Sequence, residues 1–478
     1  MNVKPAIAGE VQPPTEKDQA PPAFHWALAS LSLSMTLSAL GTGIANVGLP
    51  VLAHQFAASF QAAQWVVLAY LLAITTLIVG VGRLGDLVGR KRLLLAGLAL
   101  FTLASLLCGL APTLELLVAA RALQGLGAAV MMALTMAFVG ETVPKARTGS
   151  AMGLLGTMSA VGTALGPSLG GGLVAAFGWR ALFLVNLPLG VLTFVLARRH
   201  LPPDRQHAAA GGRPGFDAPG TLLLAATLAA YALAMTLGRG HFGPLNLALL
   251  LVAVAGAALF VRAQTRAASP LIRLAMFRDR VLSASLATSA LVSTVVMATL
   301  VVGPFYLARA LGLDTAAVGL VMSAGPLAAA LAGVPSGRLV DGFGARRMGL
   351  AGLAGMSAGS MGLALMPARL DVPGYLAPLV VLTVGYALFQ AANNTTVMAD
   401  VPPDRRGVVA GLLTLSRNLG LVTGASLMGA VFALAAGAVD IMAASPEAVA
   451  GGLHAVFGVA SVLIAVAVAI ATTTTRAR

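Results

Sequence analysis

The sequence predicts an all-α integral membrane protein, in which fourteen transmembrane helices are arranged as two repeats of six helices with two inserted helices between them. Composition predicts the membrane setting, because 58% of the 478 residues are hydrophobic and only 10% are charged, against about 25% charged residues in soluble domains. The mean hydropathy is +0.91. Long apolar runs and an internal repeat predict the number and arrangement of the helices. These runs are too continuous to be the strands of a transmembrane barrel.

A helix that crosses a bilayer needs about 20 apolar residues, and the chain contains fourteen such runs. We expect the spans at residues 27–49, 62–82, 93–111, 114–140, 150–174, 181–199, 218–238, 245–262, 281–307, 316–337, 348–366, 374–399, 408–435 and 453–473. This order divides the chain into a cytoplasmic tail (1–26), a first bundle (27–199), linkers with the two inserted helices (200–280), a second bundle (281–473) and a second cytoplasmic tail (474–478).

The basic residues predict the orientation of these spans. With the N-terminus inside, 24 of the 30 Lys and Arg residues lie in inner segments, four lie in outer loops, and Arg121 and Arg417 lie within spans. Loops on the cytoplasmic side are enriched in Lys and Arg, so both termini are expected in the cytoplasm. The net charge of +14 is therefore a topology signal. It forms no basic face with interleaved aromatics, which argues against nucleic-acid binding.

Two pairs of stretches show that the chain contains a repeat. Gly82–Arg92 and Gly337–Arg347 lie 255 residues apart and share Gly, Arg, Leu and Asp at their first, second, third and fifth positions. A second set recurs at an offset of 258, in which Gly149, Gly153, Gly162, Gly166, Ser168, Leu169 and Gly171 match Gly407, Gly411, Gly420, Gly424, Ser426, Leu427 and Gly429. An even number of spans separates the copies, so the two halves are expected to be parallel repeats about an axis along the membrane normal.

The charged loop after the second span is expected to form a cytoplasmic gate. Gly82 allows close helix approach, Asp86 can lie at the N-terminus of a neighbouring helix, and Arg90 can pair with an acid such as Glu141 at the inner end of span four. Asp341 is the counterpart of Asp86 in the second copy. The alternative is a charge-stabilised loop that only fixes topology.

Arg121 lies about seven residues from the outer end of span four, with Gln124 one turn further along. An arginine at this depth costs a few kcal/mol and usually faces a cavity or a partner; the alternative is that it snorkels to the outer surface. In span five, five small or helix-bending residues predict close packing and a bend: Gly162, Gly166, Pro167, Gly170 and Gly171.

With these motifs in order, the sequence resembles the major facilitator superfamily and, within it, the fourteen-span drug/proton antiporters of the multidrug efflux type. The resemblance covers residues 27–473 and rests on Gly82–Arg92, Arg121–Ala129, Gly162–Leu173, Trp179–Gly190 and Ile44–Pro50. It implies two six-helix bundles around a central cavity, alternating access, and export driven by inward proton movement. A proton gradient would then be the energy source, with no cofactor.

One position departs from that family's pattern. Many of these exporters carry an aspartate in span one where this chain has Gly41, and no acid lies in the middle of any span. Because an unpaired charge in a low dielectric is costly, Arg121 and Arg417 favour neutral or anionic amphiphiles as substrates. The alternative for Arg417 is a structural contact with backbone carbonyls. Further candidates for the cavity, each of which could instead be a hydrogen-bonding link between helices, are Asn46, Gln124, Tyr306, Tyr386, Gln390, Asn393, Asn394 and Asn418.

Other chemistry finds little support in the sequence. There is no phosphate-binding Gly-x-x-x-x-Gly-Lys-Ser/Thr loop, no His-Glu-x-x-His zinc motif and no cluster of acids with a nucleophile. We therefore expect no enzyme, no metal site and no ATP-driven pump. The expected function is proton-coupled export of drugs or other amphiphiles by a monomer in the inner membrane of a bacterium. A metabolite, siderophore or organic-acid exporter of the same fold is the alternative, and a non-transporting membrane sensor is a remote one.

Overall fold

The computed structural model describes residues 22–142, 148–204, 217–237, 243–267, 270–272, 274–367, 370–398, 406–437 and 444–474. Over these ranges the chain is helical and contains no β-strand. Thirteen of the described helices are long and apolar enough to cross a membrane, and the shorter apolar segment Val161–Phe177 lies where the fifth span is expected. Each of the fourteen predicted spans therefore coincides with a helical segment.

The first half contains α1 (Pro22–Gln55), α2 (Phe60–Val88), α3 (Arg90–Leu110), α4 (Leu114–Thr142), α5 (Thr148–Phe177), α6 (Ala181–Leu184) and α7 (Asn186–His200). The inserted helices are α8 (Ala218–Thr236) and α9 (Pro244–Arg266), followed by the short η3 (Leu274–Arg278). The second half contains α10 (Arg280–Phe305), η4 (Tyr306–Ala310), α11 (Thr315–Phe343), α12 (Ala345–Leu365), α13 (Asp371–Met398), α14 (Arg406–Thr423), η6 (Gly424–Met428), α15 (Gly429–Ala436) and α16 (Pro446–Thr474).

Two details differ from the predicted spans. The span expected at 181–199 is interrupted at Val185, between α6 and α7. Several helices also extend past their predicted ends; α1 begins at Pro22 and α2 continues to Val88. Hydropathy identifies only the apolar part of a helix, whereas the backbone hydrogen bonds continue through polar turns at both ends.

The repeat recognised in the sequence is present in the backbone. Gly89 joins α2 to α3 with φ +102°, and Gly344 joins α11 to α12 with φ +86°. In each turn the glycine N–H donates to the carbonyl four residues earlier, Gly89 to Gly85 and Gly344 to Val340, both at 2.9 Å. Only glycine adopts such a φ without strain. We call the end of the molecule that carries both turns the Gly89 end, and the opposite end, where Ser59 joins α1 to α2, the Ser59 end.

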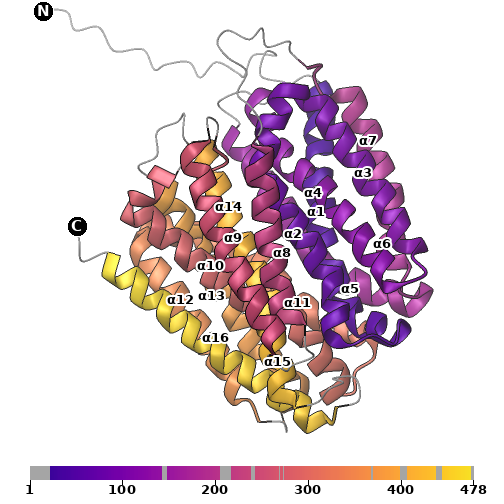
Figure 1. Ribbon diagram of the computed structural model, residues 1–478, viewed down its shortest axis with the longest axis vertical. Coiled ribbons are helices and arrows are strands. Elements are labelled where there is room, and N and C mark those ends of the chain that lie inside the picture. Colours follow the sequence, from indigo (N-terminus) through magenta and orange to yellow (C-terminus); the bar gives the residue numbers. More distant parts are fainter. Residues whose placement is uncertain are drawn as a thin grey trace, which may run out of the picture.

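The two halves form separate groups of helices that lie side by side (Figure 1). Contacts between them gather at the Ser59 end. Phe60 of α2 packs edge-on against Phe305 and Phe432 of the second half, with ring centroids 4.7 and 5.4 Å apart. A Cβ atom on Gly171 of α5 would lie 2.9 Å from the Cα atom of Gly319 on α11. The halves therefore meet through close contacts at this end.

These contacts obey the repeat symmetry. Gly171 and Gly429 are equivalent at the offset of 258, and Gln64 and Gly319 are equivalent at the offset of 255. Gly171 packs on Gly319, and Gly429 packs on the side chain of Gln64. The Gln64 amide also donates to the Ala425 carbonyl at 3.0 Å. Two equivalent helix contacts thus join the halves, one glycine to glycine and the other glycine to glutamine.

The inserted helix α8 lies beside both halves (Figure 1). At the Ser59 end, the Trp65 indole N–H of α2 donates to the Thr236 hydroxyl of α8 at 3.0 Å. Further along, Leu224 and Leu228 of α8 share an apolar cluster with Leu412 and Leu415 of α14. The first inserted helix therefore covers one junction between the repeats.

Candidate transport site

Arg121 of α4 is completely buried. Its Nε donates to the Val66 carbonyl at 2.8 Å and its Nη2 donates to the Gly41 carbonyl at 3.0 Å. Its Nη1 donates to Oε1 of Gln124. The guanidinium thus joins α1, α2 and α4, and the side chain does not snorkel to the surface. In the described part of the chain, no carboxylate pairs with it.

Aromatic rings and amides complete the surroundings of Arg121. Its guanidinium carbon lies 4.1 Å from the centroid of the Tyr70 ring and 5.9 Å from that of Phe183. Gln124 extends this hydrogen-bond network to α3, because its Nε2 donates to the Ser105 hydroxyl at 2.7 Å. A cation over an aromatic face is stabilised by the ring quadrupole. The positive charge is therefore held by carbonyl dipoles, an amide and a ring, with its net charge uncompensated by these groups.

Glycines of α4 bring Arg121 this close to its neighbours. A Cβ atom on Gly125 would lie 2.5 Å from the Tyr70 carbonyl oxygen of α2, and one on Gly127 would lie 2.7 Å from the Gly97 carbonyl oxygen of α3. Small residues let helix backbones approach in a membrane. This approach places the guanidinium within reach of the α2 backbone.

Gly41 lies directly beside this site. Its carbonyl accepts from Arg121, and a Cβ atom built on it would lie 2.8 Å from the Tyr70 hydroxyl oxygen. That hydroxyl donates to the Ser38 carbonyl at 2.8 Å. The space that an acidic side chain at residue 41 would need is therefore occupied by tyrosine.

Arg417 and Asn418 of α14 differ from Arg121, because each has a buried nitrogen without a hydrogen-bond partner among the described residues. Arg417 is half-buried, and its Nε is buried without a hydrogen-bond partner among the described residues. The neighbouring Asn418 is buried, and its Nδ2 likewise has no partner there. Buried donors in proteins are almost always satisfied. Two adjacent donors at this position therefore call for an acceptor.

Two of the remaining predicted cavity residues bond within their own helices, and two others contact a neighbouring helix. Asn46 donates to the Thr42 carbonyl of its own helix at 2.9 Å, and Gln390 donates to the Tyr386 hydroxyl at 3.2 Å. The Tyr306 ring stacks on Tyr375 at 5.8 Å. Asn393 is buried beside Ser285, whose carbonyl accepts from it at 3.4 Å, whereas Asn394 is exposed. Within the described residues, no hydrogen bond of Arg121 reaches Asn393, Arg417 or Asn418.

At the expected gate, the structure reveals an acid that the sequence did not indicate. The Asp204 carboxylate accepts from the Lys91 backbone N–H at 2.6 Å and from the Arg92 backbone N–H at 3.3 Å, at the start of α3. The Arg92 side chain lies 3.9 Å from the same carboxylate. The Lys91 ammonium donates to the Leu201 carbonyl at 2.6 Å. Asp204 thus stabilises the N-terminus of α3 and fixes it to the segment after α7.

The predicted gate residues are described less fully. The side chains of Asp86 and Glu141, and the surroundings of Gly82, lie outside the described residues. Arg90 is the first residue of α3, and Asp341 is exposed on α11. Aspartate favours helix N-termini, but Asp204 caps a helix that begins more than a hundred residues earlier in the chain. The sequence therefore could not indicate which helix Asp204 contacts.

The glycines of the span-five motif place α5 between two helices. Added Cβ atoms on Gly162, Gly166 and Gly170 would all meet α1, at 2.5 Å from the Thr36 carbonyl oxygen in the first case. Gly171 faces α11, where a Cβ would lie 2.8 Å from the Thr315 carbonyl oxygen. Pro167 lies inside the continuous helix α5. This motif therefore joins the Arg121 half to the second half.

Comparison with known proteins accords with this architecture. Residues 31–425 match the family description "Major Facilitator Superfamily". The chain belongs to this superfamily. It is accordingly a multi-pass membrane transporter and not an enzyme, and the predicted family and fold class are confirmed.

Relatives within the superfamily align over most of the chain. The uncharacterized transporter YebQ of Escherichia coli is 32% identical, over 87% of this chain and 91% of its own length. The riboflavin transporter RibZ of Clostridioides difficile is 31% identical, over 85% of this chain and 88% of its own length. The multidrug resistance protein Stp of Mycobacterium tuberculosis is 33% identical, over 85% of this chain and 75% of its own length. Among solved structures, a bacterial homologue of the human lysosomal transporter Spinster shares the fold, with a TM-score of 0.69, 15% identity and coverage of 96% and 98%.

Proposed function

We propose that this transporter exports neutral or anionic amphiphilic small molecules by proton antiport. The observation that carries the proposal is the burial of Arg121 among carbonyls, an amide and a ring, with no carboxylate paired to it in the described residues. A site with uncompensated positive charge in a low dielectric repels cations and favours anions or neutral dipoles. The unpaired donors of Arg417 and Asn418 add the same preference for an acceptor.

The relatives support a small organic substrate. Stp is named for multidrug resistance and RibZ for riboflavin transport. A multidrug resistance protein and a riboflavin transporter are thus both represented at similar identity. The second candidate function, export of a metabolite such as an organic acid or a siderophore, is favoured by the similarity to RibZ and by the same positive charges.

The contacts between the halves support alternating access. The lysine and arginine distribution favours the Gly89 end as the cytoplasmic end. The bacterial relatives favour a bacterial inner membrane as the location of the helices. In that orientation, the Phe60 contacts, the Gly171–Gly319 contact and the bond from Gln64 to Ala425 all close the outer side. Rocking of one repeat against the other would have to break them. We therefore propose that the described conformation is inward-facing and that a monomer performs this motion.

Reconstitution in liposomes tests the proposal. Purified protein should move an amphiphilic anion or neutral compound when a pH gradient is imposed, and the movement should collapse when an ionophore removes the gradient. Equal movement with and without a gradient would remove the antiport claim. In the same vesicles, Arg417→Ala should slow transport of an anionic compound more than that of a neutral one, whereas an equal loss for both would make Arg417 a structural residue.

A further inference from the structure

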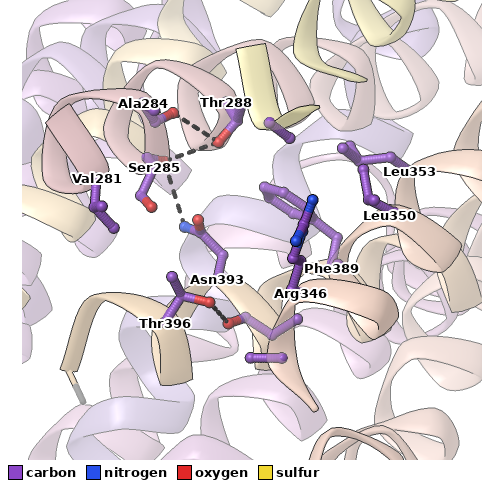
Figure 2. A pocket seen from close by; sticks show the side chains of 14 residues that line it. Val281, Ala284, Ser285, Thr288, Arg346, Leu350, Leu353, Phe389, Asn393 and Thr396 are labelled. Atoms are coloured by element: carbon purple, nitrogen blue, oxygen red, sulfur yellow. Dashed lines mark hydrogen bonds between the residues drawn. The ribbon is translucent and has the colours of Figure 1, made fainter. Parts of the chain in front are cut away.

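A cavity lies away from Arg121, between helices of the second bundle. It has a volume of about 270 Å³ and is lined by residues of α10, α12, α13 and α16. Figure 2 shows Arg346, Asn393, Phe389 and the α10 residues Ser285 and Thr288 around it. Pockets for whole drug-sized ligands occupy about 300–1,000 Å³. This cavity is therefore suited to one part of a larger amphiphile.

The cavity lies at one end of four membrane helices. Val281 is in the first turn of α10, Ala345 is the first residue of α12, Thr396 is in the last turn of α13, and Ala471 is in the last turn of α16. All four positions belong to the Gly89 end. Helix ends of this kind lie at the depth of lipid headgroups, where the hydrocarbon core gives way to polar groups.

The charge at the cavity is positive. The exposed side chain of Arg346 lines it, and in the described part of the chain no carboxylate forms an ion pair with this arginine. Arg278 and Arg280 are exposed just before Val281. Asp279, between them, accepts from the Val281 backbone N–H at 2.8 Å and so serves as the cap of α10. An anion at the mouth of the cavity would therefore meet an arginine that has no acid of its own.

The walls behind Arg346 are mainly apolar. Leu350 and Leu353 of α12 face Phe389 of α13 across the cavity (Figure 2). Two of the hydroxyls that line it bond within their own helices: Thr288 donates to the Ala284 carbonyl and Thr396 to the Ala392 carbonyl, both at 2.9 Å. A cationic mouth with an apolar interior matches a molecule with an anionic head and a hydrocarbon chain.

We propose that this cavity binds an anionic phospholipid of the surrounding bilayer, with its phosphate at Arg346 and part of one acyl chain against Leu350, Leu353 and Phe389. Basic pockets between membrane helices recognise anionic headgroups in this way. The lipid is the source that the position favours, because it is already present at headgroup depth. A free phosphate would gain nothing from the apolar walls. The proposal does not depend on which substrate the Arg121 site carries.

Native mass spectrometry of the purified full-length protein tests this site. Protein in detergent is titrated with phosphatidylglycerol, with phosphatidylcholine of the same chains, or with inorganic phosphate, and the first retained molecule is counted. Phosphatidylglycerol should bind at least tenfold more tightly than phosphatidylcholine. Arg346→Ala should weaken phosphatidylglycerol binding about tenfold, equivalent to ~1.4 kcal/mol. The matched control is Arg347→Ala, which removes a neighbouring exposed arginine that does not line the cavity and should change binding less than twofold.

A second variant tests the apolar part without removing charge. Gly349 lines the cavity, and a Cβ on it would meet only the Ala392 Cβ, at 3.6 Å. Gly349→Leu should fill the cavity and weaken phosphatidylglycerol binding while leaving Arg346 in place. Its thermal midpoint, compared with that of the wild-type protein, separates filling from misfolding.

Five results would overturn the proposal. Four of them are equal loss in the Arg346 and Arg347 variants, equal binding of the two lipids, undiminished lipid binding in a folded Gly349→Leu protein, and competition by millimolar phosphate alone, which would indicate a soluble-anion site. Displacement of the lipid by a transported anionic substrate would likewise contradict it, because the cavity would then belong to the transport path.

Discussion

The Tyr70 hydroxyl fills the space beside Gly41, where a Cβ atom would lie only 2.8 Å from its oxygen. The same tyrosine presents its ring to the Arg121 guanidinium at 4.1 Å. Tyr70 therefore fills the space that an acidic side chain at residue 41 would need. Its ring also stabilises the Arg121 guanidinium, which such an acid would instead stabilise by its charge. The arginine keeps its charge without a carboxylate among the described residues.

Introducing an acid at this position should be costly. Gly41→Asp places a side chain against Tyr70, and overpacking of this kind costs about 1–3 kcal/mol. The thermal midpoint of the purified protein should fall. Gly41→Asp combined with Tyr70→Phe removes the obstructing oxygen and should recover part of the loss. A Gly41→Asp protein as stable as the wild type would contradict the packing described for this site.

Compensating Arg121 with a charge should change substrate preference. Gln124 accepts from Arg121, so Gln124→Glu offers a carboxylate in nearly the same place and a charge-assisted hydrogen bond. Transport of an anionic compound should fall about tenfold relative to a neutral one. As a control, Gln55→Glu adds the same charge at the exposed end of α1 and should leave the anion-to-neutral ratio unchanged. An unchanged anion-to-neutral ratio in Gln124→Glu would sink the role assigned to the arginine.

Two adjacent glycines at the outer end of α5 should respond differently to the same change. A Cβ on Gly171 would lie 2.8 Å from the Thr315 carbonyl oxygen, whereas a Cβ on Gly172 would have nothing within 4 Å. Gly171→Ala should push α5 from α11 and shift the population away from the state closed at the Ser59 end by about fivefold, or ~1 kcal/mol. Gly172→Ala should behave like the wild type.

Spin labels report this shift directly. Phe177 at the end of α5 and Leu320 on α11 are exposed, and the single cysteine, Cys108, is replaced by alanine before labelling. The distance distribution between the labels should gain a longer component in Gly171→Ala and keep its wild-type form in Gly172→Ala. Identical distributions in both variants would exclude this contact as a determinant of the conformational equilibrium.

The two positive-φ turns offer another matched pair. Gly89→Ala and Gly344→Ala each strain the backbone, by about 1–3 kcal/mol. At Gly89 the new Cβ would also lie 2.6 Å from the Asp204 carboxylate, whereas Gly344 has nothing within 4 Å. Gly89→Ala should therefore lower the thermal midpoint more than Gly344→Ala does.

A double-mutant cycle tests whether Asp204 causes the larger loss of stability expected for Gly89→Ala. Asp204→Ala removes the carboxylate at the start of α3 and should itself cost about 0.5–2 kcal/mol, as the loss of a helix cap does. In that background, Gly89→Ala should cost no more than Gly344→Ala does alone. Persistence of the larger penalty would show that Asp204 is not its cause.

The fold could be predicted from the sequence because its determinants are local. A bilayer-spanning helix must satisfy its own backbone hydrogen bonds, so apolar runs identified every span. The glycines of the two loop motifs indicated the internal repeat, and the equivalent turns at Gly89 and Gly344 confirm it. The interruption at Val185 was missed, because the apolar run continues through it, although Asn186 and Pro188 follow directly.

The candidate site was predictable only in part. The depth of Arg121 in an apolar run indicated that it would be buried, and its spacing to Gln124 placed both on one face. The occupation of the Gly41 space by Tyr70 could not be read from the sequence, since the two residues meet only when α1 packs on α2. The same holds for Asp204 at the N-terminus of α3, and for Arg346 beside Asn393, which belong to different helices.

The central claim is that the positive charge of Arg121 selects against cations. It is tested most directly by transport of two fluorescent amphiphiles on one scaffold, one ending in a carboxylate and the other in a quaternary ammonium, into liposomes that contain the wild-type protein under the same pH gradient. The account predicts that the carboxylate compound moves at least tenfold faster. Equal rates, or faster transport of the quaternary ammonium compound, would contradict it.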